Sequence, residues 1–297
     1  MPSAHVASLI ASSGPSLVAA FAAFALGCGT SEITFEQSPQ SLEPPFLPAA
    51  VPLAGKQATV AIRRPHVGEI RSIREVGSIS GAAIVHRSRK QITGSTANTR
   101  RFEVLAVDGD IVTKARISFP GESTELVVGG RPTPFTPYLR GQTYLVEWRD
   151  GMLELTRSDN QPLGAGERNK LLDTVRPLVG APDFIARAVG GKQLATGTTI
   201  ALPATELAAT LGEEATVRDA NLRLIDVRGN VAVFEYHLDA RIVDEGVPHD
   251  VVSRRLVQLS MTTGDSIGEA AKTAVHTVRN DREMSFVLST TVIPVDG

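Results

Sequence analysis

The clearest pattern of hydrophobic and polar positions lies in the C-terminal third of the chain. Apolar side chains occupy every second position from Phe234 to Ile242, and polar side chains fill the positions between them. Because successive side chains of a strand point to opposite faces, this alternation predicts an interior strand over 231–243. Phe234, Tyr236 and Leu238 are expected to be buried, with the polar residues between them facing away.

Turn-forming residues divide the segment 216–295 into five strands of this kind. The breaks contain Gly, Asp and Asn, which favour tight turns, and they fall at 228–230, 244–246, 263–265 and 280–281. Alternation with a single apolar face is typical of antiparallel sheets. The C-terminal third is therefore predicted to be a β-meander.

Two hairpins are predicted nearer the N-terminus. The segment 111–119 alternates, with Ile117 and Phe119 on its apolar face and Val112 on the opposite one, and it pairs with 101–107 across an Asp-Gly turn. A second Asp-Gly turn at 149–151 joins 142–148 to 152–156.

The middle of the chain has helical spacing instead. Apolar residues at helical intervals, bounded by Pro and Gly, predict short helices over 167–176, 182–189 and 205–211. The expected fold is α+β and β-rich, with antiparallel meander sheets and a few short helices in the middle of the chain. A faint similarity between 102–117 and 222–237 leaves a duplicated sheet unit open as an alternative.

The first residues are patterned differently from the rest. Leu17–Leu26 is an uninterrupted apolar run, and no acidic or basic side chain precedes Glu32. A membrane-spanning helix needs about 20 apolar residues, so this run suits the core of a signal peptide better. We expect residues 1–27 to be a signal peptide. An uncleaved hydrophobic anchor is the alternative.

The run ends in Ala25-Leu26-Gly27-Cys28, which resembles the lipobox of bacterial lipoproteins. That resemblance implies acyl chains on Cys28, cleavage after Gly27 and anchorage in the cell envelope. Gly29 follows the cysteine where lipoproteins kept in the inner membrane of enteric bacteria have Asp, so the outer membrane is favoured over the inner. An ordinary signal peptide followed by a chance cysteine is the alternative. Two or three acyl chains give stable membrane attachment.

A proline-rich segment follows the cysteine. Residues 28–57 contain Pro39, Pro44, Pro45, Pro48 and Pro52, which favour extended backbone and remove hydrogen-bond donors. We predict a tether here and a β-rich domain over 58–297. The halves of that domain would be 58–160 and 213–297, joined by a helical segment over 161–212.

Composition narrows the possible chemistry. The formal net charge is -2 and aromatic residues make up 5% of the chain, which argues against a nucleic-acid partner. The chain has a single cysteine, so a disulfide within it is impossible, and a lipidated Cys28 would leave the domain without a thiol nucleophile. A basic pair, Arg63-Arg64, follows the tether and offers a contact for anionic headgroups, although solvated charge is the favoured interpretation.

One polar face remains a candidate for catalysis or metal binding. Glu235, His237 and Asp239 alternate along the strand predicted over 231–243, so they share its polar face. His237 with Asp239 offers an acid–base pair for an envelope hydrolase, which is the alternative hypothesis. A solvated face opposite the apolar one is the favoured interpretation, and no cofactor or metal is expected.

The function expected from the sequence is that of a membrane-anchored envelope lipoprotein without enzymatic activity. Its membrane contact is made through acylated Cys28, and its domain binds an envelope protein or an apolar ligand such as a lipid. Large curved sheets with helices on one face are also found in the periplasmic carriers of lipoproteins, a resemblance of architecture alone.

Overall fold

The computed structural model describes residues 55–297 with the exception of 86–87, 134–136, 177, 181–183, 212–214, 245–246, 280–281 and 296–297. The predicted signal peptide, Cys28 and nearly all of the predicted tether lie outside the described residues. Among the helices within these ranges, none combines the length and the hydropathy that a membrane crossing requires.

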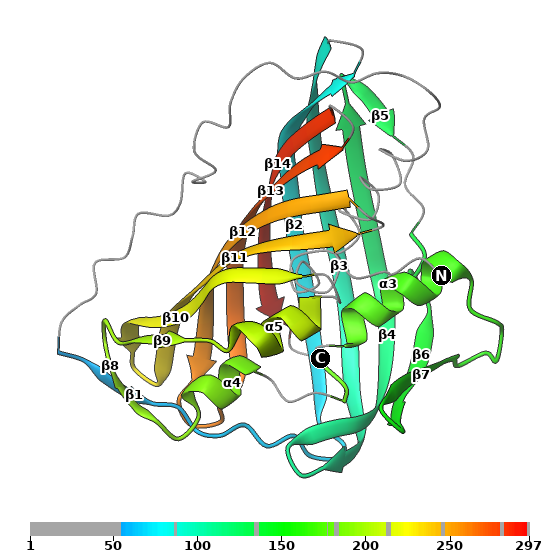
Figure 1. The fold of residues 1–297 in the computed structure, drawn as a ribbon. Helices are drawn as coiled ribbons and strands as arrows, with labels where there is room; N and C mark the ends of the chain where they lie inside the picture. Colours follow the sequence, from blue (N-terminus) through cyan, green and yellow to red (C-terminus); the bar gives the residue numbers. More distant parts are fainter. Residues whose placement is uncertain are drawn as a thin grey trace.

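Within the described residues, twelve strands pair into one sheet in the order β7-β6-β4-β3-β2-β14-β13-β12-β11-β10-β9, with β5 added beside β4, and every pairing among them is antiparallel. Figure 1 shows that this sheet twists strongly from β4 to β10. The strands span β2 (Ile70–Val85), β3 (Ser88–Asp108), β4 (Ile111–Val128), β5 (Arg131–Thr133), β6 (Thr143–Arg149), β7 (Met152–Arg157), β9 (Thr199–Ala201), β10 (Thr216–Arg228), β11 (Val231–Asp244), β12 (Val247–Ser260), β13 (Ser266–Arg279) and β14 (Arg282–Pro294).

The two halves of the chain meet where the last strand pairs with the first long one. β14 lies antiparallel to β2, with Leu288 opposite Ile79 and Phe286 opposite Gly81. A Cβ atom on Gly81 would lie 2.5 Å from the Cβ of Phe286, so glycine is required for this close approach. The pairing makes one continuous sheet of two regions that are distant in sequence.

Three helices lie on one face of this sheet (Figure 1), which we call the inner face. They are α3 (Ala165–Val175), α4 (Phe184–Val189) and α5 (Ala204–Leu211). Helices α4 and α5 pack on a large apolar cluster that includes Ile79, Phe234, Tyr236, Leu238 and Leu288. Helix α3 packs on a small apolar cluster that includes Phe102, Ile117, Tyr144, Leu171 and Val175.

A small second sheet ties down the start of the domain. β1 (Gln57–Thr59) pairs antiparallel with β8 (Gln193–Ala195), and the Lys56 ammonium lies 3.0 Å from the Asp226 carboxylate. The last residues of the predicted tether are therefore already attached to the folded domain.

The β-rich, antiparallel fold with a few short helices is confirmed. The meander of five strands, both hairpins and the three helices are found at the predicted positions. On β11, Phe234, Tyr236 and Leu238 are buried, as alternation required. The duplicated sheet unit remains a prediction.

One expected facing is wrong. Alternation along 111–119 predicts Val112 on the face opposite Ile117, but the Val112 side chain is only 4% exposed and belongs to the small apolar cluster. The register between β3 and β4 shifts on both sides of Ala106. A β-bulge adds an unpaired residue and therefore reverses which side chains face inward beyond it.

Candidate functional site

The predicted polar face lies on β11, on the side of the sheet away from the helices, which we call the outer face. Glu235, His237 and Asp239 share this face, as expected, but each contacts a different neighbour. The Glu235 carboxylate accepts a hydrogen bond of 2.6 Å from Arg223, and Asp239 lies 2.8 Å from Arg218.

His237 contacts an acid other than the predicted one. Its Nε2 lies 3.6 Å from the carboxylate of Asp219 on β10, whose side chain is 57% exposed. Within the part of the chain that the structure describes, no hydrogen bond joins His237 to Asp239, and no group of three or more acidic, histidine or cysteine side chains is placed to hold a metal. The acid–base pair of His237 and Asp239 that the hydrolase hypothesis requires is therefore not formed among the described residues.

His249 lies on the inner face and is used in packing. Its ring is 7% exposed, and its Nδ1 lies 2.7 Å from the hydroxyl of Thr277 on β13. Burial lowers the pKa of His249 to about 4, so the ring is neutral at physiological pH. Its neighbour Asp250 points to the outer face and pairs there with Arg218 and Arg241.

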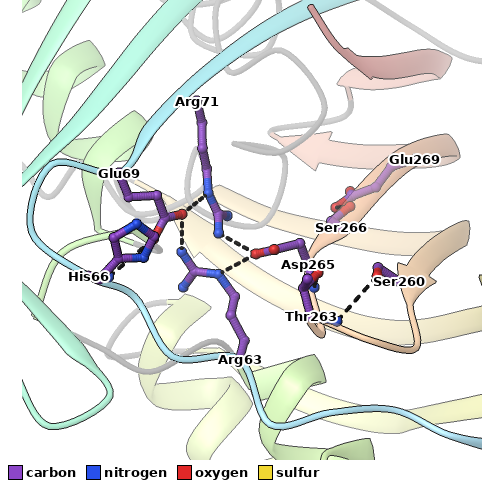
Figure 2. A network of polar contacts seen from close by, with 9 residues as sticks. All are labelled: Arg63, His66, Glu69, Arg71, Ser260, Thr263, Asp265, Ser266 and Glu269. Atoms are coloured by element: carbon purple, nitrogen blue, oxygen red, sulfur yellow. Dashed lines mark hydrogen bonds and ion pairs between the residues drawn. The ribbon is translucent and has the colours of Figure 1, made fainter. Parts of the chain in front are cut away.

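Four charged residues form a closed ring at the end of β2, which we call the charged ring (Figure 2). Arg63 contacts Glu69 and Asp265, each at 3.0 Å, and Arg71 contacts the same two acids. Burial raises the pKa of both carboxyls, but Arg71 and Arg63 outweigh that effect at Glu69, and a hydrogen bond with Thr263 together with the two arginines outweighs it at Asp265, so each pKa lies below its ordinary value.

The charged ring fastens the segment after β1 to the turn between β12 and β13. The Ala61 amide donates to the Met261 carbonyl at 2.9 Å, and Gly264 in the same turn has a φ of +74°. A Cβ atom on Gly264 would lie 2.3 Å from the carbonyl oxygen of Ala61. Arg63 is therefore engaged by two acids of its own chain, whereas Arg64 is exposed.

A second group of charged residues lies on the inner face, where a β-rich domain normally places apolar side chains. Along β3, the side chains that face inward change in character. They are apolar at Ile92 and again at Phe102, and polar between them at Thr96, Asn98 and Arg100. We call the central group the polar belt. Its members on the described residues are Glu75, Thr96, Asn98, Arg100, Glu122, Thr124, Lys170, Arg255 and Glu269.

The polar belt runs across neighbouring strands at one level of the sheet. Asn98 on β3 lies opposite Glu75 on β2 and Glu122 on β4, and Glu269 lies on β13 in the same row. It separates the two apolar clusters, since Ile92 belongs to the large cluster and Phe102 to the small one. Helix α3 reaches it through the ion pair between Lys170 and Glu122.

Burial is the main cause of the pKa shifts of Glu75 and Lys170 in the polar belt. Burial raises the pKa of Glu75, and the charge of Arg100 only partly opposes that effect. Burial likewise lowers the pKa of Lys170 to about 8. The Arg255 guanidinium lies over the ring of Tyr236 at 5.6 Å from its centroid, a favourable cation–π geometry.

Four polar atoms of this region have no hydrogen-bond partner among the described residues. They are the Oε1 of Glu75, the Oδ1 of Asn98, the Nε of Arg100 and the hydroxyl of Tyr236, and the side chains of Glu75, Arg100 and Tyr236 are at most 8% exposed. Buried polar groups are nearly always hydrogen-bonded in folded proteins. The polar belt is thus the most unusual chemical feature of the described chain.

Sequence reasoning missed this belt. The available signal was phase: Asn98 and Arg100 have the same parity along β3 as Phe102 and Val104, so they face the same side. The sequence around Glu75 gave a weaker indication that Glu75 faces inward. Gly77 and Ile79 have the same parity along β2, and of these only Ile79 is a large apolar residue.

Comparison with known proteins assigns no family to the chain. No family model and no curated protein matches it. Among solved structures, lipovitellin, in a study of its lipid–protein interactions, is similar with a TM-score of 0.45 and 9% identity, over 78% of this chain and 25% of that one. This chain therefore spans about a quarter of the lipovitellin chain.

Two further structures are more distant. DynF from the dynemicin biosynthesis pathway of Micromonospora chersina has a TM-score of 0.22 and 8% identity, over 89% of this chain and 95% of that one. The translocator domain of the autotransporter NalP from Neisseria meningitidis has a TM-score of 0.26 and 8% identity, over 78% and 90%. At these values the likenesses identify neither a fold family nor a function.

Proposed function

We propose that this protein is a lipoprotein of the bacterial cell envelope that binds an apolar ligand between the inner face of its sheet and its helices. Acyl chains on Cys28 anchor it, and the proline-rich tether holds the domain away from the headgroups. No chemistry is assigned to the outer face in this proposal.

The observation that carries the proposal is the way the inner face is covered. The large apolar cluster draws on strands from both halves of the chain, yet the helices over it have only six residues in α4 and eight in α5. Helices this short are unstable alone, so they keep their position through packing. An acyl chain offers the same kind of contact and can replace that packing.

The connection between the two helices also fits a cover that moves as a unit. Arg187 of α4 lies 2.7 Å from Glu206 of α5, and both side chains are at least half exposed. Exposed ion pairs of this type contribute only about 0–1 kcal/mol. Displacing the pair of helices from the sheet would leave that contact intact.

Anchorage is tested by fractionating cells that express the Cys28→Ala chain. The expected result is loss of acylation, with either release from the membrane fraction or accumulation of uncleaved precursor. A processed Cys28→Ala protein that still sediments with membranes would disprove the lipobox interpretation.

Ligand binding is tested by native mass spectrometry of the full Cys28→Ala chain purified from its own host. A retained mass that organic solvent extracts supports the proposal. Hexadecanol and palmitate are then added to delipidated protein. Binding of neither compound, together with no retained lipid, contradicts an apolar-ligand function.

A further inference from the structure

The polar belt combines buried charges with unsatisfied hydrogen-bonding atoms. Arg100 is 8% exposed, and within the described ranges no carboxylate lies within salt-bridge distance of its guanidinium. Glu75 is 2% exposed, and its Oε1 has no partner there either. Leaving such groups unpaired is costly in a protein interior, because each has lost its hydration without a replacement.

The location of these groups is informative. Arg100 and Glu75 lie between the two apolar clusters, at the level where α3 meets the sheet through Lys170. Glu75 on β2 and Arg100 on β3 are on neighbouring strands, and the charge of Arg100 acts on the Glu75 carboxyl. An apolar surface that ends at polar groups matches a molecule with an apolar chain and a polar end.

The hydrogen-bonding character of the belt favours an anionic end. Arg100 is a permanent donor that accepts no hydrogen bond. Burial raises the pKa of Glu75, which favours its protonated, donating form. The two other acids are engaged: Glu122 with Lys170, and Glu269 as acceptor from the Ser266 hydroxyl at 3.3 Å (Figure 2).

We propose that the polar belt binds the anionic head of the ligand through Arg100 and Glu75, so that the ligand is an acyl chain ending in a carboxylate or phosphate. The chain lies along the large apolar cluster. This inference rests on the apolar-ligand function proposed above. It specifies in addition that the polar end of the ligand is anionic.

The test compares three probes on the full, delipidated Cys28→Ala chain. Palmitate carries a chain and an anionic head, hexadecanol carries the same chain with a neutral head, and inorganic phosphate is an anion without a chain. Native mass spectrometry and titration give the affinities. Palmitate is expected to bind at least tenfold more tightly than hexadecanol, because a hydrogen bond to a charged group adds about that much.

A matched pair of variants assigns this preference to a residue. Arg100→Met removes the buried charge, whereas Arg101→Met removes the neighbouring charge, which is exposed on the outer face. Arg100→Met is expected to weaken palmitate binding by about tenfold or more and to leave hexadecanol binding unchanged. Arg101→Met is expected to change neither. Arg100→Lys, which keeps a cation, is expected to retain part of the preference.

Each outcome separates the inference from the function on which it rests. Equal affinities for palmitate and hexadecanol, or a preference that survives in folded Arg100→Met protein, would overturn the anionic head while leaving the apolar-ligand function standing. Phosphate binding as tight as palmitate binding would overturn the role of the chain. If neither chain-bearing probe binds, the proposed function itself fails.

Discussion

The two faces of the large sheet carry the same kinds of charged residue in opposite circumstances. On the outer face, Glu235 and Asp239 each lie against an arginine and remain partly exposed to water. On the inner face, Glu75 and Arg100 are at most 8% exposed, and the Oε1 of one and the Nε of the other have no hydrogen-bond partner among the described residues. The environment of a charged side chain, rather than its residue type, therefore decides whether it is an ordinary solvated surface residue or part of a candidate binding site.

Stability follows the same division. Outer-face ion pairs are screened by water, so each contributes little. Inner-face charges reduce stability unless a ligand or another group compensates them. The three predictions that follow test this contrast, beginning with the apolar side chains that hold the inner face together.

The largest effect is expected from Phe234→Ala. The side chain is fully buried in the large apolar cluster, and truncating such a phenylalanine typically costs about 3–5 kcal/mol. We expect a severe drop in the melting temperature and in the denaturation midpoint. A change below about 1 kcal/mol would mean that β11 does not face the core as described.

A smaller effect of opposite sign is expected from Glu75→Gln. Because burial raises the pKa of Glu75, ionisation costs folding free energy above the pKa of the unfolded chain. We expect about 1 kcal/mol of stabilisation at pH 7, measured by chemical denaturation. Below about pH 4.3 the carboxyl is protonated in both states, so the difference should shrink towards zero.

Glu103→Gln is the matched control for this prediction. Glu103 lies on β3 with its side chain 29% exposed and pairs with Arg116 at 2.8 Å. Its removal should change stability by at most about 1 kcal/mol, in the destabilising direction. Equal effects from the two variants would abolish the distinction between the faces.

The smallest effect is expected from His237→Ala. Among the described residues, the His237 Nε2 lies 3.6 Å from an exposed acid and the Nδ1 has no hydrogen-bond partner, so removing the ring breaks no strong contact and we expect a stability change within about 0.5 kcal/mol by thermal denaturation. If this variant unfolds, His237 must face the core, and the facing assigned to the side chains of β11 is wrong. A folded variant that loses a hydrolytic activity present in the parent would instead favour the hydrolase hypothesis.

Much of the local structure could be predicted from the sequence. Strict alternation placed Phe234, Tyr236 and Leu238 inward, and Asp-Gly pairs marked both N-terminal hairpins, because these signals depend on a few neighbouring residues. The phase error at Val112 has a local cause as well. A bulge depends on the register of the partner strand, which no single segment encodes.

The polar belt could not be assembled in the same way. Its members come from β2, β3, β4, β12, β13 and α3, and each looks like an ordinary polar surface residue in its own segment. Only the parity of Asn98 and Arg100 with Phe102 indicated that they face inward. Their neighbours across the sheet remained unknown until the strand order was known.

The sequence by itself determined the C-terminal meander, two hairpins, three short helices and the facing of its most regular strand, since these follow from side-chain periodicity and turn chemistry, whereas the strand β2 was not predicted. It also supplies the lipobox pattern at Cys28, which stays a prediction. The tertiary structure decided that β14 pairs with β2, that three helices share one face, and that buried charges gather between two apolar clusters. These are consequences of long-range pairing, which brings together residues that no local pattern links.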